Sequence, residues 1–388
     1  MRSRAVLAAA TVLAAALVAV PTAGAAKGLL VGIYDEPETL GNAGKAFPLM
    51  RTLRSQVVRV NLYWGSGYGR TGTGLGVAKR RPADPTNPDD KAYDWSLYDR
   101  TIRSAVRHRM KVVLAIYGTP GWANRGNGPN VPPARMADLR DFAYAAATRY
   151  SGTHVPSGDD PDALPLPAVR HWLAWNEPNN PVFLRTQYRR VAGRWVIQSA
   201  VDYARICNAI YTGVKATFIV SQKVACGVTA PRGNNAPKQR RPSVAPIAFL
   251  VAAKNAGMKN FDAYAHHPYY GQATETPTSR PVARTAVGLG NLNDLVAELT
   301  RLYGQKRLWL TEYGYQTRPP DRLFGVSYAK QASYLRQAFT VARKHPRIDM
   351  MLWFLLRDQR DIGGWQSGLI TLGGAKKPAF RAFQRLPR

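Results

Sequence analysis

Two glutamates in this chain of 388 residues follow apolar segments, where an unpartnered carboxylate is unfavourable. Glu177 comes after residues 169–176, and Glu312 comes after residues 307–311. Removing a carboxylate from water at the end of a hydrophobic strand costs free energy unless the group is paired or used in chemistry. A pair of such groups suits reaction at an acetal carbon: one protonates the leaving oxygen, and the other attacks carbon or activates water. The remaining glutamates are Glu36, Glu38, Glu275 and Glu298.

The elements that must position these carboxylates alternate between strand and helix. The segments that read as strands are 29–34, 57–64, 111–117, 169–176, 223–228, 261–267, 307–311 and 348–355. Helical patterns lie between or after them at 47–53, 97–106, 196–214, 292–303 and 378–386. Alternation of this kind indicates parallel strands joined by crossover helices. Eight such units predict an α/β fold, a closed (β/α)8 TIM barrel in a single domain, with its site at the carboxyl ends of the strands.

The segments around both glutamates resemble the fourth- and seventh-strand motifs of the clan A glycoside hydrolases. These segments are Trp175-Asn176-Glu177-Pro178 and Thr311-Glu312-Tyr313-Gly314. Weaker likenesses follow in the expected order. Residues 59–64 are similar to the second-strand pattern of family 5, residues 267–269 to a sixth-strand His-x-Tyr, and residues 117–122, with 84–88 and 93–95, to family 39. Asn61 replaces a proline of the family 5 pattern, and the third strand ends without a histidine, so the family and the sugar stay open.

The resemblance implies a retaining glycoside hydrolase that cleaves O-glycosidic bonds, expected to be β-linked, by double displacement. Glu177 would be the acid/base and Glu312 the nucleophile. Arg59 and the hydroxyl of Tyr269 would keep Glu312 ionised, because a neighbouring cation and a hydrogen-bond donor favour a carboxylate. Asn176 would bind the 2-hydroxyl of the sugar. The alternatives are that Arg59 forms a barrel ion pair and that Tyr269 only packs.

Three further side chains complete the predicted substrate-binding set. His267 is expected to face the site and His266 the helices, because neighbouring residues of a strand point to opposite sides. Trp353 is expected to stack on a sugar ring. Trp175 or Trp122 is expected to form an apolar wall that raises the pKa of Glu177, and the alternative for Trp122 is a place in the core. No metal or cofactor is expected, because the two histidines have no third ligand near them in sequence.

The first 26 residues have the layout of a secretory signal peptide. Arg2 and Arg4 precede an apolar run, residues 5–20, and small residues follow at 23–26. We expect cleavage there and a secreted, monomeric domain of residues 27–388. No later segment is long and apolar enough for stable membrane insertion. Cys207 and Cys226 would then meet an oxidising compartment, and whether they form a disulfide stays open.

The formal net charge of +30, from 54 basic and 24 acidic residues, is the unusual property of the composition. Such a charge suits nucleic acid, an anionic membrane or an acidic polymer. No nucleic-acid partner is expected, because the chain has neither zinc-finger spacing nor an RNA-binding aromatic motif. Residues 67–72 fit G-x-G-x-x-G but open no helix, which argues against a dinucleotide site. Basic runs at 79–81 and 238–241 leave an acidic polysaccharide open as substrate, and the alternative function is an inert barrel that binds cell-envelope glycan.

Overall fold

The computed structural model describes residues 28–66, 74–157 and 164–388, and eight of their strands close into a barrel. These strands are β1 (Leu30–Tyr34), β2 (Val57–Tyr63), β3 (Lys111–Tyr117), β4 (His171–Ala174), β7 (Lys223–Thr229), β8 (Ala263–His266), β9 (Arg307–Tyr313) and β10 (Ile348–Phe354). Every neighbouring pair is parallel, and β10 pairs with β1 to close the ring. The predicted single-domain (β/α)8 TIM barrel is therefore confirmed.

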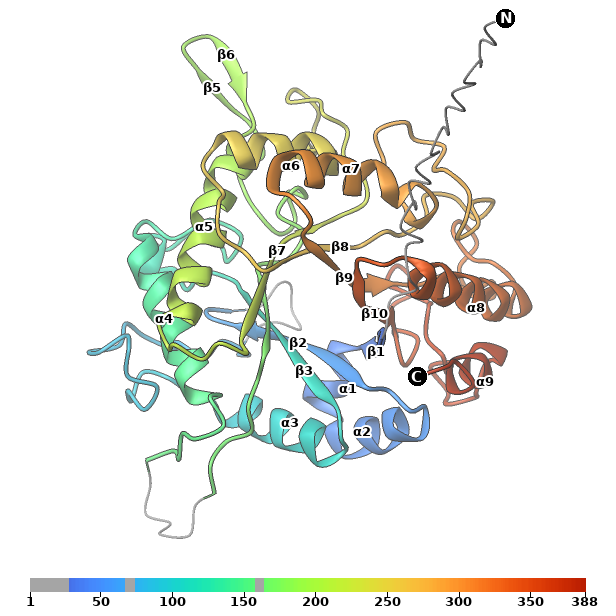
Figure 1. Cartoon of the computed structure of the whole chain (residues 1–388), viewed down its shortest axis with the longest axis horizontal. Helices are drawn as coiled ribbons and strands as arrows, with labels where there is room; N and C mark the ends of the chain where they lie inside the picture. The colour runs from blue at the N-terminus through green and yellow to red at the C-terminus, as the bar shows by residue number, and fades with distance from the viewer. Residues whose placement is uncertain (1–27, 67–73, 158–163) are drawn as a thin grey trace, which may run out of the picture.

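Helices surround the barrel on its outer side (Figure 1). They are α1 (Glu36–Gly41), α2 (Ala43–Thr52), α3 (Ser96–Arg107), α4 (Met136–Arg149), α5 (Gln198–Lys215), α6 (Pro246–Asn255), α7 (Leu292–Tyr303), α8 (Tyr328–Lys344) and α9 (Pro378–Gln384), with short 3-10 turns at Gly121–Ala123 and Leu289–Asn291. Among the described residues, no helix has the length and apolar character needed to cross a membrane.

The core has two layers, because each strand is covered on both faces. Inside the barrel, Val113, Ala115 and Leu173 pack with residues of the other strands. Outside it, a larger apolar cluster fills the space between the strands and the helices. A strand buried on both sides reads as a continuous apolar run, which explains why the barrel strands were visible in the sequence. Polar side chains gather where those runs end.

A small hairpin stands outside the barrel, and the sequence did not predict it. Strands β5 (Arg189–Val191) and β6 (Arg194–Val196) pair antiparallel and project from the rim (Figure 1). The two residues between them, Ala192 and Gly193, have φ angles of 47° and 78°. A two-residue hairpin turn needs this left-handed backbone, and Asn-Gly is its usual signal, so Ala-Gly gave little warning. The helix expected from residue 196 consequently begins at Gln198.

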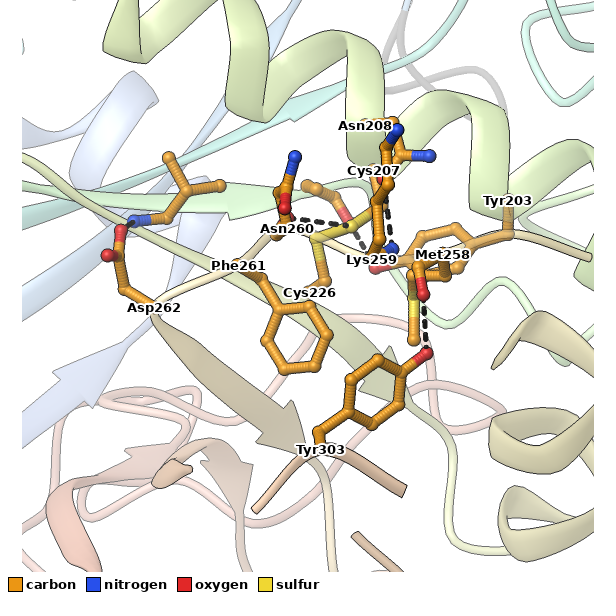
Figure 2. The surroundings of a disulfide bond; sticks show 12 residues. Tyr203, Cys207, Asn208, Cys226, Met258, Lys259, Asn260, Phe261, Asp262 and Tyr303 are labelled. Atoms are coloured by element: carbon orange, nitrogen blue, oxygen red, sulfur yellow. Dashed lines mark hydrogen bonds between the residues drawn. A yellow bond between two sulfur atoms is a disulfide. The ribbon is translucent and has the colours of Figure 1, made fainter. Parts of the chain in front are cut away.

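The two cysteines form a disulfide, which the sequence had left open. The bond joins Cys207 on α5 to Cys226 on β7, and both residues are fully buried (Figure 2). Beside it, the side chain of Asn208 donates a hydrogen bond to the carbonyl of Gly257 at 2.8 Å, and the hydroxyl of Tyr303 donates one to the carbonyl of Met258 at 2.8 Å. The bridge therefore fixes α5 against the strand that follows it. The predicted signal segment, residues 1–26, lies outside the described residues, as does the whole of the G-x-G-x-x-G segment, residues 67–72.

Candidate active site

The loop after β4 presents Glu177 from an unusual backbone. Trp175 and Glu177 have φ angles of 72° and 36°, which side-chain-bearing residues rarely adopt. Such a residue costs about 1–3 kcal/mol, so the surroundings must enforce it. The amide of Trp175 donates to the carbonyl of Ile116 at 2.9 Å, its indole donates to the carbonyl of Phe183 at 2.7 Å, and the amide of Glu177 donates to the carbonyl of Val228 at 2.9 Å. Neighbouring strands thus hold the turn that aims Glu177.

A cavity of about 510 Å³ opens at the carboxyl ends of the barrel strands, and Glu177 and Glu312 both line it. The other lining residues are Tyr34, Glu36, Asn61, Tyr63, Tyr117, Asn176, Asn180, Val182, Phe183, Ala230, Pro231, Arg232, Tyr269, Phe354 and Trp365. This wall combines several aromatic rings with a few polar groups, which is the usual make-up of a small-molecule site.

Glu312 is held by one hydrogen-bond donor on each carboxylate oxygen. The guanidinium of Arg59 donates to Oε1 at 2.6 Å, and the hydroxyl of Tyr269 donates to Oε2 at 3.0 Å. Burial, followed by the charge of Glu312, raises the pKa of Tyr269 well above its usual value, so this phenol stays protonated. The carboxylate of Glu312 is thus paired with a buried cation and with a phenol donor.

Arg59 is fully buried and links Glu312 to two asparagines. Its second terminal nitrogen donates to Oδ1 of Asn176 at 2.6 Å and to Oδ1 of Asn61 at 3.1 Å. Burial alone would lower the pKa of Arg59, but the charge of Glu312 and of neighbouring acidic groups outweighs it and raises that pKa. Because arginine only donates, the amide oxygen of Asn176 must face Arg59, and its NH2 group remains available to a ligand.

His267 lies beneath both glutamates, as the expected orientation of its strand requires. Its Nε2 is 3.1 Å from Nη1 of Arg59, and its Nδ1 is 3.0 Å from Oε1 of Glu177. Burial lowers the pKa of His267 to about 3, so the ring is neutral near pH 7. Nε2 must accept from Arg59, and Nδ1 therefore carries the proton and donates to Glu177. His266 instead contacts Thr229 and the carbonyl of Val287, away from the cavity.

Glu177 occupies an environment unlike that of Glu312. Burial raises its pKa to about 7, although a hydrogen bond from the side chain of Asn180, 3.2 Å from Oε2, acts in the opposite direction. One carboxylate oxygen of Glu177, one of Glu312 and a ring nitrogen of His267 lie within 4.8 Å of one another. The site thus holds one carboxyl whose pKa is raised to about 7 beside one that is paired with a buried cation.

Although this trio has the spacing of a metal site, its hydrogen bonds disfavour one. The proton on Nδ1 of His267 removes the lone pair that faces Glu177, and Nε2 faces the Arg59 guanidinium. A cation bound between the glutamates would also meet the positive charge of Arg59, 2.6 Å from Glu312. The arrangement suits proton transfer and nucleophilic attack better than metal binding.

Several solved structures share the fold that carries this site. A family 39 glycoside hydrolase from Bacteroides cellulosilyticus WH2 matches 92% of this chain at 19% identity with a TM-score of 0.60, and this chain spans 63% of its length. A glucosidase from Croceicoccus marinus matches 93% of this chain and 68% of its own at 15% identity and a TM-score of 0.64. An endo-β-1,4-glucanase from Xanthomonas axonopodis pv. citri matches 92% of this chain and 98% of its own length. Its sequence identity is 15%, and the TM-score is 0.55. The fold is that of the (β/α)8 glycoside hydrolases. No family model matches the sequence, and no curated protein matches it.

Two aromatic residues that the sequence predicted for the site, Trp353 and Trp122, lie outside the cavity that Glu177 and Glu312 line. Trp353 does not reach the cavity: it is fully buried, and its indole donates to the carbonyl of Ser367 at 2.9 Å. The expectation that it stacks on a sugar is wrong, because the next residue, Phe354, is the one that faces the cavity. Trp365, in the loop that follows, lines the cavity with its ring centre 4.7 Å from that of Tyr269.

Trp122 is also absent from the wall around Glu177. It lines a separate cavity of about 500 Å³ with residues 79–81, and the guanidinium of Arg81 lies 4.6 Å from the centre of its ring. The predicted role of Trp122 in raising the pKa of Glu177 is therefore wrong. Phe183 and Val182 lie on the cavity wall near Glu177 instead.

Among the cavity residues that sequence reasoning missed, three bear on the chemistry of the site: Glu36, Arg232 and Trp365. Glu36 follows β1 just as Glu312 ends β9, so the argument that found the pair should also have found it. The hydroxyl of Tyr63 lies 2.8 and 3.0 Å from its two oxygens, and burial raises the pKa of Glu36. Arg232 and Trp365 lie in loops, where no periodic pattern marks a side chain that faces the site.

Proposed function

We propose that this chain is a retaining glycosidase that hydrolyses β-linked glycans. The observation that carries the proposal is the Glu177–Glu312 pair. One carboxylate oxygen of Glu177 and one of Glu312 lie within 4.8 Å of each other. Retaining enzymes hold their carboxyl groups about 5–5.5 Å apart, whereas inverting enzymes leave about 6.5–9.5 Å for a water molecule. The shared fold with glycosidases and glucanases supports the same conclusion.

In the first step, Glu312 attacks the anomeric carbon while Glu177 transfers its proton to the leaving oxygen. The bond from the anomeric carbon to that oxygen breaks, and an ester joins Glu312 to the sugar. Since the pKa of Glu177 is about 7, this carboxyl is protonated in much of the enzyme at neutral pH. The Arg59 guanidinium and the Tyr269 hydroxyl favour the ionised nucleophile.

In the second step, Glu177 removes a proton from water, the resulting hydroxide attacks the anomeric carbon, and Glu312 leaves as a carboxylate. Formation of the ester removes the charge of Glu312, which favours ionised Glu177 as the base. The NH2 group of Asn176 is placed to donate to the sugar 2-hydroxyl, and the ring of Trp365 offers an apolar face to a pyranose.

The substrate we propose is a β-linked poly- or oligosaccharide, because solved neighbours include a glucosidase and an endo-β-1,4-glucanase. We further propose that the protein is exported as a monomeric enzyme after removal of residues 1–26. The buried Cys207–Cys226 disulfide supports export, because such bonds persist in oxidising compartments.

Covalent trapping tests the nucleophile. An activated 2-fluoro-glycoside should label Glu312, detected by mass spectrometry of the digested protein. The matched control is Glu312→Gln, which should stay unlabelled. A label on any other residue, with hydrolysis intact in the wild type, would overturn the assignment.

Rescue by azide tests the acid/base. Glu177→Ala should lose activity on substrates with poor leaving groups, and azide should restore turnover on activated aryl glycosides as a β-glycosyl azide forms. Lack of rescue would contradict the role of Glu177. Glycan binding without hydrolysis in the wild type would favour the alternative of an inert envelope-binding barrel, which the paired glutamates do not favour.

A further inference from the structure

Arg232 is the one basic side chain among the described residues that line the cavity. It is exposed, and it donates one long hydrogen bond, from Nη1 to the carbonyl of Gly271 at 3.3 Å. Within the described ranges, no carboxylate lies at salt-bridge distance from it. Glu275, which is close to Gly271, accepts hydrogen bonds from the backbone amides of Gly271 and Val282 at 2.6 and 2.8 Å. Most of the five N–H donors of Arg232 therefore have no protein partner among the described residues.

The backbone that carries Arg232 is fixed on its N-terminal side. Asn179 accepts from the amide of Ala230 at 2.8 Å and donates to the carbonyl of Ala230 at 3.1 Å. The next carbonyl, that of Pro231, accepts from the amide of Val287 at 2.9 Å. Hydrogen bonds from two other loops therefore fix the backbone position from which the Arg232 side chain reaches the cavity.

Arg232 stands on the side of the cavity that belongs to Glu177. It follows β7, which is the barrel neighbour of β4, whereas Glu36 and Tyr63 line the wall formed by β1 and β2. The charge of Arg232 also favours the ionised form of the Glu177 carboxyl, against the larger effect of burial. Since the acid/base protonates the leaving oxygen, the leaving part of the substrate lies on this side.

We propose that Arg232 recognises an oxyanion, a carboxylate or a sulfate, on the sugar at the leaving-group side of the scissile bond. This inference rests on the proposed glycosidase function and names the class of its substrate: acidic glycans. A planar guanidinium pairs with a carboxylate or sulfate through two parallel hydrogen bonds, which is stronger and more selective than a contact with a hydroxyl. The formal net charge of +30 would also draw an anionic polymer toward the protein.

The test compares acidic glycans with neutral versions of the same backbone. Glucuronoxylan and hyaluronan oligosaccharides, each in native form and after chemical reduction of the carboxyl groups, are the uronate probes. Chondroitin sulfate before and after desulfation is the sulfate probe. For each pair, the ratio of kcat/KM on the acidic form to that on the neutral form is measured, together with binding to each form by titration calorimetry.

The variants are Arg232→Gln and, as the matched control, Arg240→Gln. Arg240 is exposed in the same loop but does not line the cavity, so its removal changes the net charge equally. Loss of charge-assisted hydrogen bonds should lower the acidic-to-neutral ratio about 10-fold or more in Arg232→Gln. The ratio should be maintained in Arg240→Gln. The pair that responds, reduced or desulfated, identifies the oxyanion.

Two results would overturn the proposal: equal treatment of acidic and neutral forms by the wild type, or equal loss of the ratio in both variants. The second would assign the preference to the overall charge. Failure of the proposed glycosidase function would give a different result from failure of the oxyanion site. If no glycan is cleaved but acidic forms still bind more tightly in a manner that requires Arg232, the oxyanion site is supported and the hydrolase function is refuted.

Discussion

Replacement of Arg59 by methionine should destabilise the protein because it leaves a buried carboxylate without its cation. Arg59 is fully buried and donates to Glu312, Asn61 and Asn176, and methionine can form none of these hydrogen bonds. Breaking one side of a buried ion pair costs about 3–5 kcal/mol. Methionine roughly fills the space of the side-chain stem, so the loss reports the charge more than a void.

The design is a double-mutant cycle. The free energy of unfolding is measured by urea denaturation for the wild type, Arg59→Met, Glu312→Gln and the double variant. Because the double variant contains neither unpaired charge, its loss should be smaller than the sum of the single losses by about 2 kcal/mol, within the range expected for residues in direct contact. Arg59→Lys, which keeps the charge, should recover part of the stability.

Single losses that add within about 0.5 kcal/mol would refute the reasoning, because they would show that the two side chains do not stabilise each other in the folded state.

Three further predictions concern the acid, the aromatic wall and the disulfide. Glu177 must be protonated to act as the acid, and its pKa is about 7, so kcat/KM should fall as the pH rises through about 7. This fall should vanish in Glu177→Gln assayed with an activated aryl leaving group. A fall at the same pH in that variant would contradict the assignment. Trp365→Ala should raise KM up to about tenfold, whereas Trp353→Phe should lower the melting temperature with little change in KM; the reverse pattern would restore the sequence-based expectation. Replacing Cys207 and Cys226 by serine should lower the free energy of unfolding by about 3 kcal/mol, as expected for a loop with a separation of 19 residues, and an unchanged urea midpoint would show that the bridge adds no stability.

The barrel was predictable because its strands are buried on both faces. The segment 111–117 coincides with β3, and 292–303 coincides with α7, since apolar runs and helical spacing there meet no competing signal. Glu177 and Glu312 were found by the same logic, as charged groups at the ends of apolar runs. Glu36 also follows an apolar run, residues 29–34. It was not predicted because it lies in none of the segments that resemble family motifs.

What could not be predicted depends on register and on loops. Along a strand, a shift of one residue moves a side chain to the opposite face, and this separates buried Trp353 from Phe354 at the cavity. Trp365 and Arg232 reach the cavity only because tertiary contacts position their loops, and loop sequence carries no period that reports direction. Trp122 was expected beside Glu177, but the Arg81 guanidinium covers its ring in a separate cavity.

The left-handed backbone at Trp175 and Glu177 implies that this protein is not at its stability optimum. The barrel enforces two unfavourable residue conformations and one buried carboxyl in order to aim a single side chain. A substitution such as Glu177→Gly would relax the backbone and remove the buried acid together, so stability selection without an activity screen would favour it. Directed evolution for heat resistance should therefore inactivate this protein first by substitutions at Glu177, the acid/base that we propose.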